Sequence, residues 1–290
     1  MGLEVSKTKA LTATVLAGTL VASGAALVSA QDDAPDYAGQ SLVISNWAGY
    51  MPEDLPERFE EATGIPVTVA NHATNEEIVA KLTAGGDSGI DVAFVSGQFA
   101  QALGEGGALA ELDHSQIPNM ANLYPEATEL AYDPGNTVSA PYAWGTTGLC
   151  YRSDLVAEEP TSWNDLLQPA EDVTGKTTML ATERWLMLPA QKALGFSVNT
   201  TDPEEMAQVK DVLSATKDTL LAYDDTTFYS RLVSGEAVLV EAWDGWCNYG
   251  IADPEVGSQI KFVVPEEGSD LWVDTMTVLE SSPNKEAAHA

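Results

Sequence analysis

Aromatic residues and carboxylates occur together at the ends of several predicted strands. Trp47 and Tyr50 follow the first strand. Residues 243–246 (Trp-Asp-Gly-Trp) follow a later strand, and residues 272–274 (Trp-Val-Asp) open the last one. An aromatic face packs against a methylene chain and attracts an ammonium group, at roughly 0.5 to 2 kcal/mol per contact, while a carboxylate holds the charge. The pattern therefore indicates a site for a small cationic amine.

Each of these Trp residues, taken alone, is more often a core or interface residue. Their repeated placement at strand ends in both halves of the chain favours a shared cleft, because α/β sheets bind ligands beyond the carboxyl ends of their strands. We therefore expect Trp47, Trp243 and Trp272 to face one cavity, with Asp274 beside them.

A catalytic site has little support in the sequence. Residues 86–89 (Gly-Asp-Ser-Gly) match the nucleophile motif of chymotrypsin-like proteases, but that mechanism also needs a base His oriented by a buried acid. The upstream His, His72, lacks the expected context, and a turn explains the motif better. His72, His114 and His289 are too scattered for a zinc site. We expect no enzyme activity, cofactor or metal, and a secreted hydrolase using Ser88 stays a distant alternative.

The chain contains two cysteines, Cys150 and Cys247. In an exported protein they could form a disulfide, and two buried free thiols fit equally well. They do not form a Cys-x-x-Cys pair, which disfavours redox catalysis.

Short apolar runs alternate with helical patterns along the chain, which predicts an α/β fold with a largely parallel sheet. The third strand ends at Ser96, so its carboxyl end should lie next to that of the first strand, at Trp47. The expected strands are residues 42–44, 67–69, 90–95, 177–181, 237–243, 260–264 and 272–279, and the expected helices are residues 52–63, 75–82, 161–167, 184–194 and 203–221.

The amino end has the layout of a secretory signal peptide. Lys7 and Lys9 precede an uncharged apolar run over residues 10–28, and residues 28–30 (Val-Ser-Ala) form a cleavage site before Gln31. A transmembrane anchor is the alternative, since a bilayer span takes about 20 apolar residues. The absence of a Cys directly after the run disfavours a lipid-modified amino terminus. We expect an exported protein, located in the periplasm.

The net charge of −31 excludes nucleic acid as a partner. General acidity for solubility explains this charge, because Asp and Glu are scattered, and attraction of a cationic ligand explains it too. Removal of the signal peptide leaves about 260 residues, enough for two domains. Residues 282–288 open a helix with Pro283 in its first turn, and the sequence ends before two turns are complete. We expect a further carboxyl-terminal segment.

Taken together, these residues resemble the spermidine/putrescine-binding periplasmic proteins of ABC transporters, a family of bacterial extracellular solute-binding proteins. The matches run through the whole mature chain in order. They are Asn46-Trp47 with Tyr50-Met51-Pro52, Phe59 with Thr63-Gly64-Ile65 and Val67, Asn75-Glu76, Asp91-Val92, Ser96, Pro141-Tyr142, Trp144-Gly145, Thr147, Thr161-Ser162-Trp163, Asp165-Leu166, residues 199–203, Pro265, Glu267-Gly268, Trp272, Asp274 and residues 284–286.

The resemblance implies a type II periplasmic-binding-protein fold, in which two α/β lobes joined by crossover strands close over a polyamine. It implies lobe 1 at residues 41–148 plus 270–290, lobe 2 at residues 149–269, and bending near Gly148 and Gly268. It also implies ABC permease subunits as partners, and we expect a monomer. The roles that it implies are aromatic walls for Trp47, Trp243 and Trp272, first-lobe contacts for Ser96 and Gln98, an ammonium-binding carboxylate for Asp274 and a rim position for Tyr50.

The sequence departs from the family at several of these positions. Ala48 and Gly49 replace the acid or hydroxyl that usually follows the first Trp. The acidic segment of the second lobe is also altered, which leaves Glu183 and Trp185 as the nearest candidates, and Asp244 and Trp246 are unusual. A receptor for another small amine or a compatible solute is therefore the alternative. A ferric-ion receptor is disfavoured, because the sequence lacks an adjacent Tyr pair.

Overall fold

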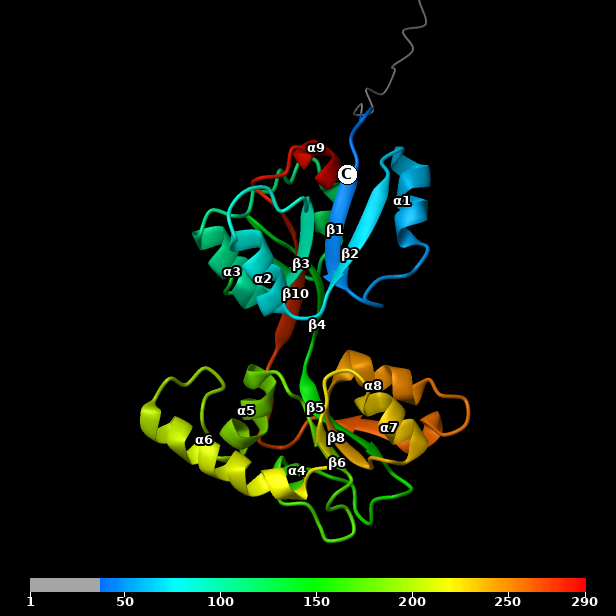
Figure 1. Cartoon of the computed structure of the whole chain (residues 1–290), viewed down its shortest axis with the longest axis vertical. Coiled ribbons are helices and arrows are strands. Elements are labelled where there is room, and N and C mark those ends of the chain that lie inside the picture. Colours follow the sequence, from blue (N-terminus) through cyan, green and yellow to red (C-terminus); the bar gives the residue numbers. More distant parts are fainter. Residues whose placement is uncertain (1–36) are drawn as a thin grey trace, which may run out of the picture. The chain divides into compact units, whose positions relative to one another are not determined.

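The computed structural model describes residues 37–290, and the predicted signal peptide at residues 1–30 lies outside the described residues. The described chain forms two five-stranded sheets, each covered by helices on both faces (Figure 1). The first sheet has the order β2-β1-β3-β10-β4 and the second has the order β7-β6-β8-β5-β9. We call each sheet with its helices a lobe. The α/β class and the two-lobe architecture predicted from the sequence are confirmed.

The first lobe contains the strands at both ends of the described chain. Its strands are β1 (Leu42–Trp47), β2 (Val67–His72), β3 (Val92–Ser96), β4 (Ala140–Gly145) and β10 (Trp272–Val278). Its helices are α1 (Leu55–Thr63), α2 (Asn75–Thr83), α3 (Gly97–Glu105) and α9 (Lys285–Ala288), with short 3-10 turns η1 (Pro118–Asn122) and η2 (Pro125–Thr128).

The second lobe is formed by one continuous stretch of the chain. Its strands are β5 (Thr147–Arg152), β6 (Thr177–Met179), β7 (Ala222–Tyr223), β8 (Leu239–Trp243) and β9 (Ile260–Val263). Its helices are α4 (Asn164–Leu167), α5 (Glu183–Ala193), α6 (Pro203–Thr216), α7 (Phe228–Ser234) and α8 (Asp244–Ile251), with 3-10 turns η3 (Lys217–Thr219) and η4 (Gly257–Gln259).

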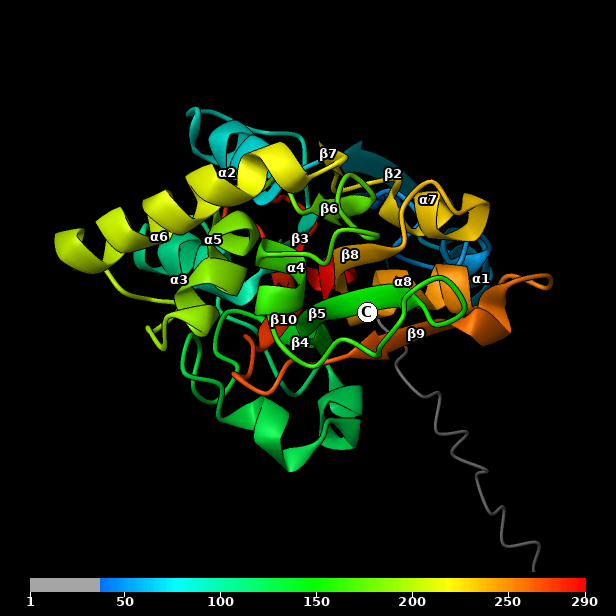
Figure 2. The same cartoon turned by 90° about the horizontal axis from the view of Figure 1, so that it is seen from below.

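Alternation along the strands divides the core of the second lobe into two layers. On β5 and β8, Leu149 and Leu239 pack with helices α4 to α6, whereas Cys150 and Val240 pack with α7 and α8. Successive side chains of a strand point to opposite faces, so both faces of this sheet are apolar. Figure 2 shows the sheet between these two groups of helices. A disulfide joins Cys150 on β5 to Cys247 on α8, with their Cα atoms 6.0 Å apart.

In each sheet four strands run in one direction and one runs opposite, which fits the predicted largely parallel pattern. β10 runs antiparallel to β3 and β4, and β5 runs antiparallel to β8 and β9. Both strands enter their sheet from the other lobe. The start of β10 therefore lies beside the end of β3, and the start of β5 lies beside the end of β8. Asp274 near the start of β10 pairs with Ser96, and Thr147 at the start of β5 pairs with Trp243.

Two predicted elements end earlier than expected, because hydrogen bonds stop them. The helix predicted over residues 203–221 ends at Thr216, since the backbone N–H of Leu221 donates to Thr177 O (2.8 Å) and starts β7. The strand predicted over residues 177–181 ends at Met179, because carboxylates of other segments accept hydrogen bonds from the next two backbone N–H groups.

The segments that cross between the lobes are tied together by Asp270. Its carboxylate accepts a hydrogen bond from the backbone N–H of Thr147 (3.0 Å), and its carbonyl oxygen accepts one from the Thr146 hydroxyl (2.7 Å). Both crossovers, β4 to β5 and β9 to β10, therefore meet at one point. Among the helices of residues 37–290, none combines the length and apolar character that a bilayer span requires.

Candidate functional site

A cavity of about 690 Å³ lies between the lobes and is lined by side chains of both. The first lobe contributes the carboxyl ends of β1 and β3 and the start of β10, while the second contributes the end of β8 and the first turns of α5 and α8. Because parallel strands end at the same edge of a sheet, residues that are distant in sequence meet here. The aromatic side chains that line the cavity are Trp47, Tyr50, Trp185, Trp243, Trp246, Tyr249 and Trp272.

Asp274 is an acid of the first-lobe wall whose carboxylate is held by hydrogen bonds. Its Oδ2 accepts a hydrogen bond from the Tyr50 hydroxyl (2.7 Å), and its Oδ1 accepts one from the Ser96 hydroxyl (2.7 Å). The side-chain amide of Asn75 donates to the Ser96 oxygen (3.0 Å) and accepts from the Ser96 backbone N–H (2.9 Å). This chain of hydrogen bonds holds the carboxylate in place, and each of its oxygens can accept a further hydrogen bond.

Burial raises the pKa of Asp274, and the hydrogen bonds from Tyr50 and Ser96 partly offset this rise. Burial also raises the pKa of the Tyr50 hydroxyl, and the negative charge of Asp274 raises it further, so Tyr50 stays a neutral donor. A cation next to Asp274 would favour the ionised carboxylate. The site is therefore arranged to gain from a positively charged partner.

Two aromatic pairs line the cavity, one in each lobe. In the first lobe, the Trp47 and Tyr50 rings pack edge to face with their centroids 5.3 Å apart. In the second lobe, Trp185 and Trp243 pack edge to face at 4.9 Å. Such pairs fix the ring orientations, so that flat apolar surfaces are ready to receive a ligand.

One cation of the protein already lies against this wall. The Arg184 guanidinium lies over the Trp185 ring, 4.2 Å from its centroid. Burial lowers the pKa of Arg184, and attraction by Asp270, Asp274 and Glu76 opposes this change. The Trp185 indole N–H also donates to Asp270 Oδ2 (3.1 Å), which connects the cavity wall to the crossover segments.

Several buried polar atoms of the cavity wall have no hydrogen-bond partner among residues 37–290. They are Nε1 of Trp243, Nε1 of Trp272 and Nε2 of His72. The other ring nitrogen of His72 is hydrogen-bonded to the Ser45 hydroxyl (2.9 Å), and burial lowers the pKa of the imidazole, which keeps it neutral. A buried unpaired donor is costly, so the two indole N–H groups would gain from a ligand that carries acceptors, whereas the role of His72 Nε2 depends on the tautomer.

Eight of the eleven predicted ligand-binding residues line the cavity and three do not. Gln98 is exposed on the first turn of α3, and Glu183 is exposed on the first turn of α5. Asp244 lies at the crossover, where a Cβ added to Gly145 would be 2.3 Å from its carboxylate and 2.2 Å from Trp272. The eight that line it are Trp47, Tyr50, Ser96, Trp185, Trp243, Trp246, Trp272 and Asp274.

The cavity also contains residues that the sequence does not single out as site residues. The acid Asp225 and its neighbour Thr226 follow a strand of two residues, which is too short to give a periodic signal. Tyr249 lies on α8 one turn after Trp246, a helical spacing that could have identified it. Its hydroxyl donates to Gly49 O (3.3 Å), which bridges the two lobes at the rim.

The Gly-Asp-Ser-Gly motif forms a turn away from this cavity. The Asp87 carboxylate accepts a hydrogen bond from the Gly89 backbone N–H (2.8 Å), and the Ser88 hydroxyl accepts one from the Ile90 backbone N–H (3.3 Å). Both bonds are typical of Asx and Ser turns. Within residues 37–290, no group of three or more His, Cys, Asp or Glu side chains is placed to hold a metal ion.

Comparison with known proteins gives a consistent result. The family model described as "Bacterial extracellular solute-binding protein" matches residues 55–290. The spermidine/putrescine-binding periplasmic protein of Escherichia coli (strain K12) is 30% identical over 275 residues, covering 94% of this chain and 76% of that protein. The putrescine/cadaverine-binding protein of Pseudomonas aeruginosa is 30% identical over 260 residues, covering 87% of this chain and 73% of the relative.

Solved structures extend the similarity to the fold. The TpPotD lipoprotein of Treponema pallidum matches with a TM-score of 0.80 at 27% identity, covering 86% of this chain and 78% of that one. The spermidine/putrescine ABC transporter substrate-binding protein of Streptococcus pneumoniae matches with a TM-score of 0.73 at 28% identity, covering 86% and 76%. The resemblance predicted from the sequence motifs is thereby confirmed.

Proposed function

Because this chain belongs to the bacterial extracellular solute-binding protein family, we propose that it captures a polyamine, such as putrescine or spermidine, for an ABC importer. The observation that carries this proposal is the cavity in which Trp47, Trp272 and Asp274 of the first lobe face Trp243 of the second. The names of the relatives that bind spermidine and putrescine support the same ligand class.

The chemistry of the cavity suits a slender cation with an apolar body. An ammonium group would bind Asp274, whose oxygens are already oriented by Tyr50 and Ser96. Methylene groups would pack between the indole rings, where an ammonium is also attracted by the ring quadrupole. No bond is made or broken in this process, so we propose a receptor and not an enzyme.

We further propose that ligand binding closes the lobes. Of the two expected bending points, Gly268 lies in the β9 to β10 crossover and has a left-handed φ of 78° that favours glycine, whereas Gly148 is the second residue of β5, directly after the β4 to β5 crossover. A ligand that contacts both lobes binds the closed form better and shifts the population toward it. The closed form would dock on the permease subunits in the membrane, from the periplasm and as a monomer.

A second candidate ligand class is a compatible solute that carries an acceptor group. The unpartnered indole N–H groups of Trp243 and Trp272 favour this alternative, because an ammonium group cannot accept hydrogen bonds. Aromatic surfaces also attract quaternary ammonium groups. The hydrolase alternative instead requires Ser88 to react with a serine-directed phosphonate.

Calorimetric titration of the purified protein with putrescine, spermidine and glycine betaine tests the assignment. We expect binding heat and a rise in melting temperature with at least one of the two polyamines. Heat with glycine betaine alone would replace the polyamine by the compatible solute. The absence of binding heat with all three compounds, or labelling of Ser88 by a phosphonate, would contradict the proposed function.

A further inference from the structure

The cavity has an acid on its second-lobe side. Among residues 37–290, the acids that line it are Glu77 and Asp274 of the first lobe and Asp225 of the second. The side chain of Glu77 is exposed, and its carboxylate accepts a hydrogen bond from the Ala73 backbone N–H (2.8 Å). Asp225 is half-buried. Because water screens an exposed charge more strongly, Asp225 is the better partner for a cation that is held away from Asp274.

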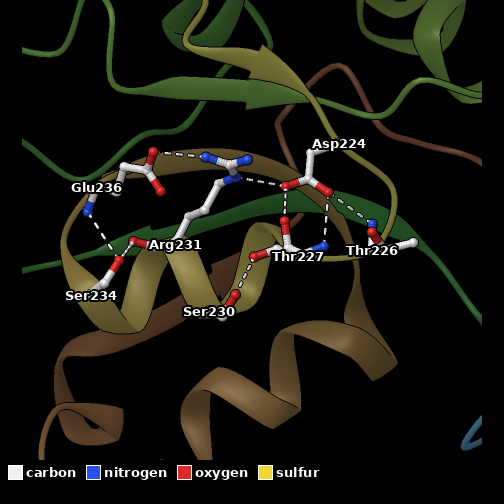
Figure 3. Close-up of polar contacts among 7 residues, drawn as sticks. All are labelled: Asp224, Thr226, Thr227, Ser230, Arg231, Ser234 and Glu236. Atoms are coloured by element: carbon white, nitrogen blue, oxygen red, sulfur yellow. Dashed lines mark hydrogen bonds and ion pairs between the residues drawn. The ribbon is translucent and has the colours of Figure 1, made fainter.

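The loop that carries Asp225 is held in place by its neighbour. The buried Asp224 accepts hydrogen bonds from the backbone N–H groups of Thr226 (2.9 Å) and Thr227 (2.8 Å) and from Nε of Arg231 (2.7 Å). Figure 3 shows this network at the start of α7. Because Asp224 is committed to these bonds, the loop is fixed and Asp225 has a set position in the cavity wall.

The carboxylate of Asp225 is oriented in the same manner as that of Asp274. Its Oδ1 accepts a hydrogen bond from the Ala181 backbone N–H (2.7 Å), and its Oδ2 accepts one from the Thr182 hydroxyl (2.9 Å). Each oxygen can accept one more hydrogen bond. In the described part of the chain, neither Asp225 nor Asp274 forms an ion pair with a Lys, Arg or His side chain.

From this geometry we propose that Asp225 binds the second ammonium group of the ligand, so that the cavity selects a diammonium compound held by one carboxylate from each lobe. This inference rests on the proposed function and specifies its ligand. Aromatic rings lie in the cavity wall together with the two acids, and they suit the methylene chain between the charges. A ligand held at both ends gains its second contact only when the lobes are together, which couples binding to closure.

The test compares putrescine with 1-butylamine, which has the same four-carbon chain and one ammonium group. We expect the wild-type protein to bind putrescine at least 10-fold more tightly than 1-butylamine. Asp225→Asn should weaken putrescine binding at least 10-fold and change 1-butylamine binding by less than 3-fold. Asp225→Ser serves as a second variant, since a hydroxyl can also accept the bond from Ala181.

Glu183→Gln is the matched control, because it removes one exposed negative charge near the same turn outside the cavity, and it should leave both affinities unchanged. If both Asp225 variants lost affinity equally for putrescine and 1-butylamine and also had a lower melting temperature, Asp225 would have only a structural role. This result would overturn the inference. So would loss of diamine preference in Glu77→Gln instead. A wild-type protein that binds both amines equally would refute only the second contact, whereas one that binds no amine would refute the proposed function itself.

Discussion

At the scale of single residues, the proposed amine site centres on the Asp274 carboxylate, which hydrogen bonds from Tyr50 and Ser96 hold in place. Asn75 at the start of α2 donates a hydrogen bond to Ser96 on β3, and Ser96 donates one to Asp274 on β10. Tyr50 donates another to Asp274. Preorganisation of this kind lowers the entropic cost of binding, because the acceptor does not have to be ordered by the ligand.

Asp274→Asn tests this residue directly. We expect the affinity for a polyamine to fall by about 2 kcal/mol or more, roughly 30-fold in Kd, because a desolvated ammonium loses its charge partner. Calorimetric titration measures the change. Asp172→Asn, an exposed acid on the second lobe, is the control with the same chemistry. Unchanged affinity in Asp274→Asn would reject the role of this carboxylate.

The same residue predicts how binding depends on pH. Burial raises the pKa of Asp274, so protonation begins at a higher pH than for a solvent-exposed Asp. We expect the Kd for putrescine to rise as the pH is lowered from 7 toward this pKa, because the neutral acid no longer attracts the ammonium. In Asp274→Asn this pH dependence should be largely absent. An identical pH profile in both proteins would contradict the assignment.

Sequence reasoning finds the strand-end residues of the site but not those held by loops. Trp47 and Trp243 can be found in this way because each ends an apolar run, and Trp272 because it opens one, at the positions where the fold class places a cavity. Asp225 cannot be identified from the sequence in this way, because β7 has two residues and the loop after it is held by side-chain hydrogen bonds of Asp224. Whether Gln98 lines the cavity depends on the direction of a helix, which composition does not encode.

At the scale of elements, the start of α7 shows how a cap supports the site. Burial alone would raise the pKa of Asp224, but hydrogen bonds from Thr227, Thr226 and Arg231 lower it to about 2 (Figure 3). An acid with a lowered folded-state pKa stabilises the fold above its ordinary pKa of 3.8, and this stability is lost as the pH falls toward 2.

Asp224→Asn should therefore lower the free energy of unfolding by about 2 kcal/mol at pH 7. The difference from wild type should shrink as the pH falls from about 4 to about 2, where the wild-type carboxylate itself becomes protonated. Urea unfolding across this pH range measures both quantities. A difference that stays constant over the range would show that the charge of Asp224 does not stabilise the loop.

The crossover beside the cavity depends on a glycine at Gly145. A methyl group there would lie 2.2 Å from the Trp272 ring and 2.3 Å from the Asp244 carboxylate, which is closer than atoms can approach. We expect Gly145→Ala to displace Trp272 and to weaken amine binding about 10-fold or more. Gly104→Ala on α3, where a Val138 methyl group is 3.2 Å away, is the control. Equal affinities of both variants would contradict this account.

Element types could be predicted from periodicity, but strand direction and some ends could not. Gly64 ends α1 in a left-handed conformation, as expected of a Gly after a helical pattern. The direction of β10 depends on its arrival from the second lobe, which a local pattern does not contain. The end of α6 depends on a hydrogen bond from Leu221 to β6, which is likewise non-local.

At the scale of the whole molecule, the net charge and the proposed lobe closure both bear on the cavity. The net charge is −31, while the acids that line the cavity in residues 37–290 are Glu77, Asp225 and Asp274. Most of the acidic residues therefore lie outside the cavity, and their long-range attraction for cations is screened by salt. Selectivity has to come from the short-range contacts inside the cavity. Both crossovers meet at Asp270, which also accepts a hydrogen bond from the cavity residue Trp185, so the proposed closure would also move the cavity wall.

A crystal structure of the protein grown with putrescine tests the central claim most directly. The account predicts one ammonium group within hydrogen-bond distance of Asp274 and a methylene chain between the indoles of Trp243 and Trp272, with the lobes closed around it. Putrescine bound outside this cavity, or inside it with no contact to Asp274 and with the indoles turned away, would contradict the account.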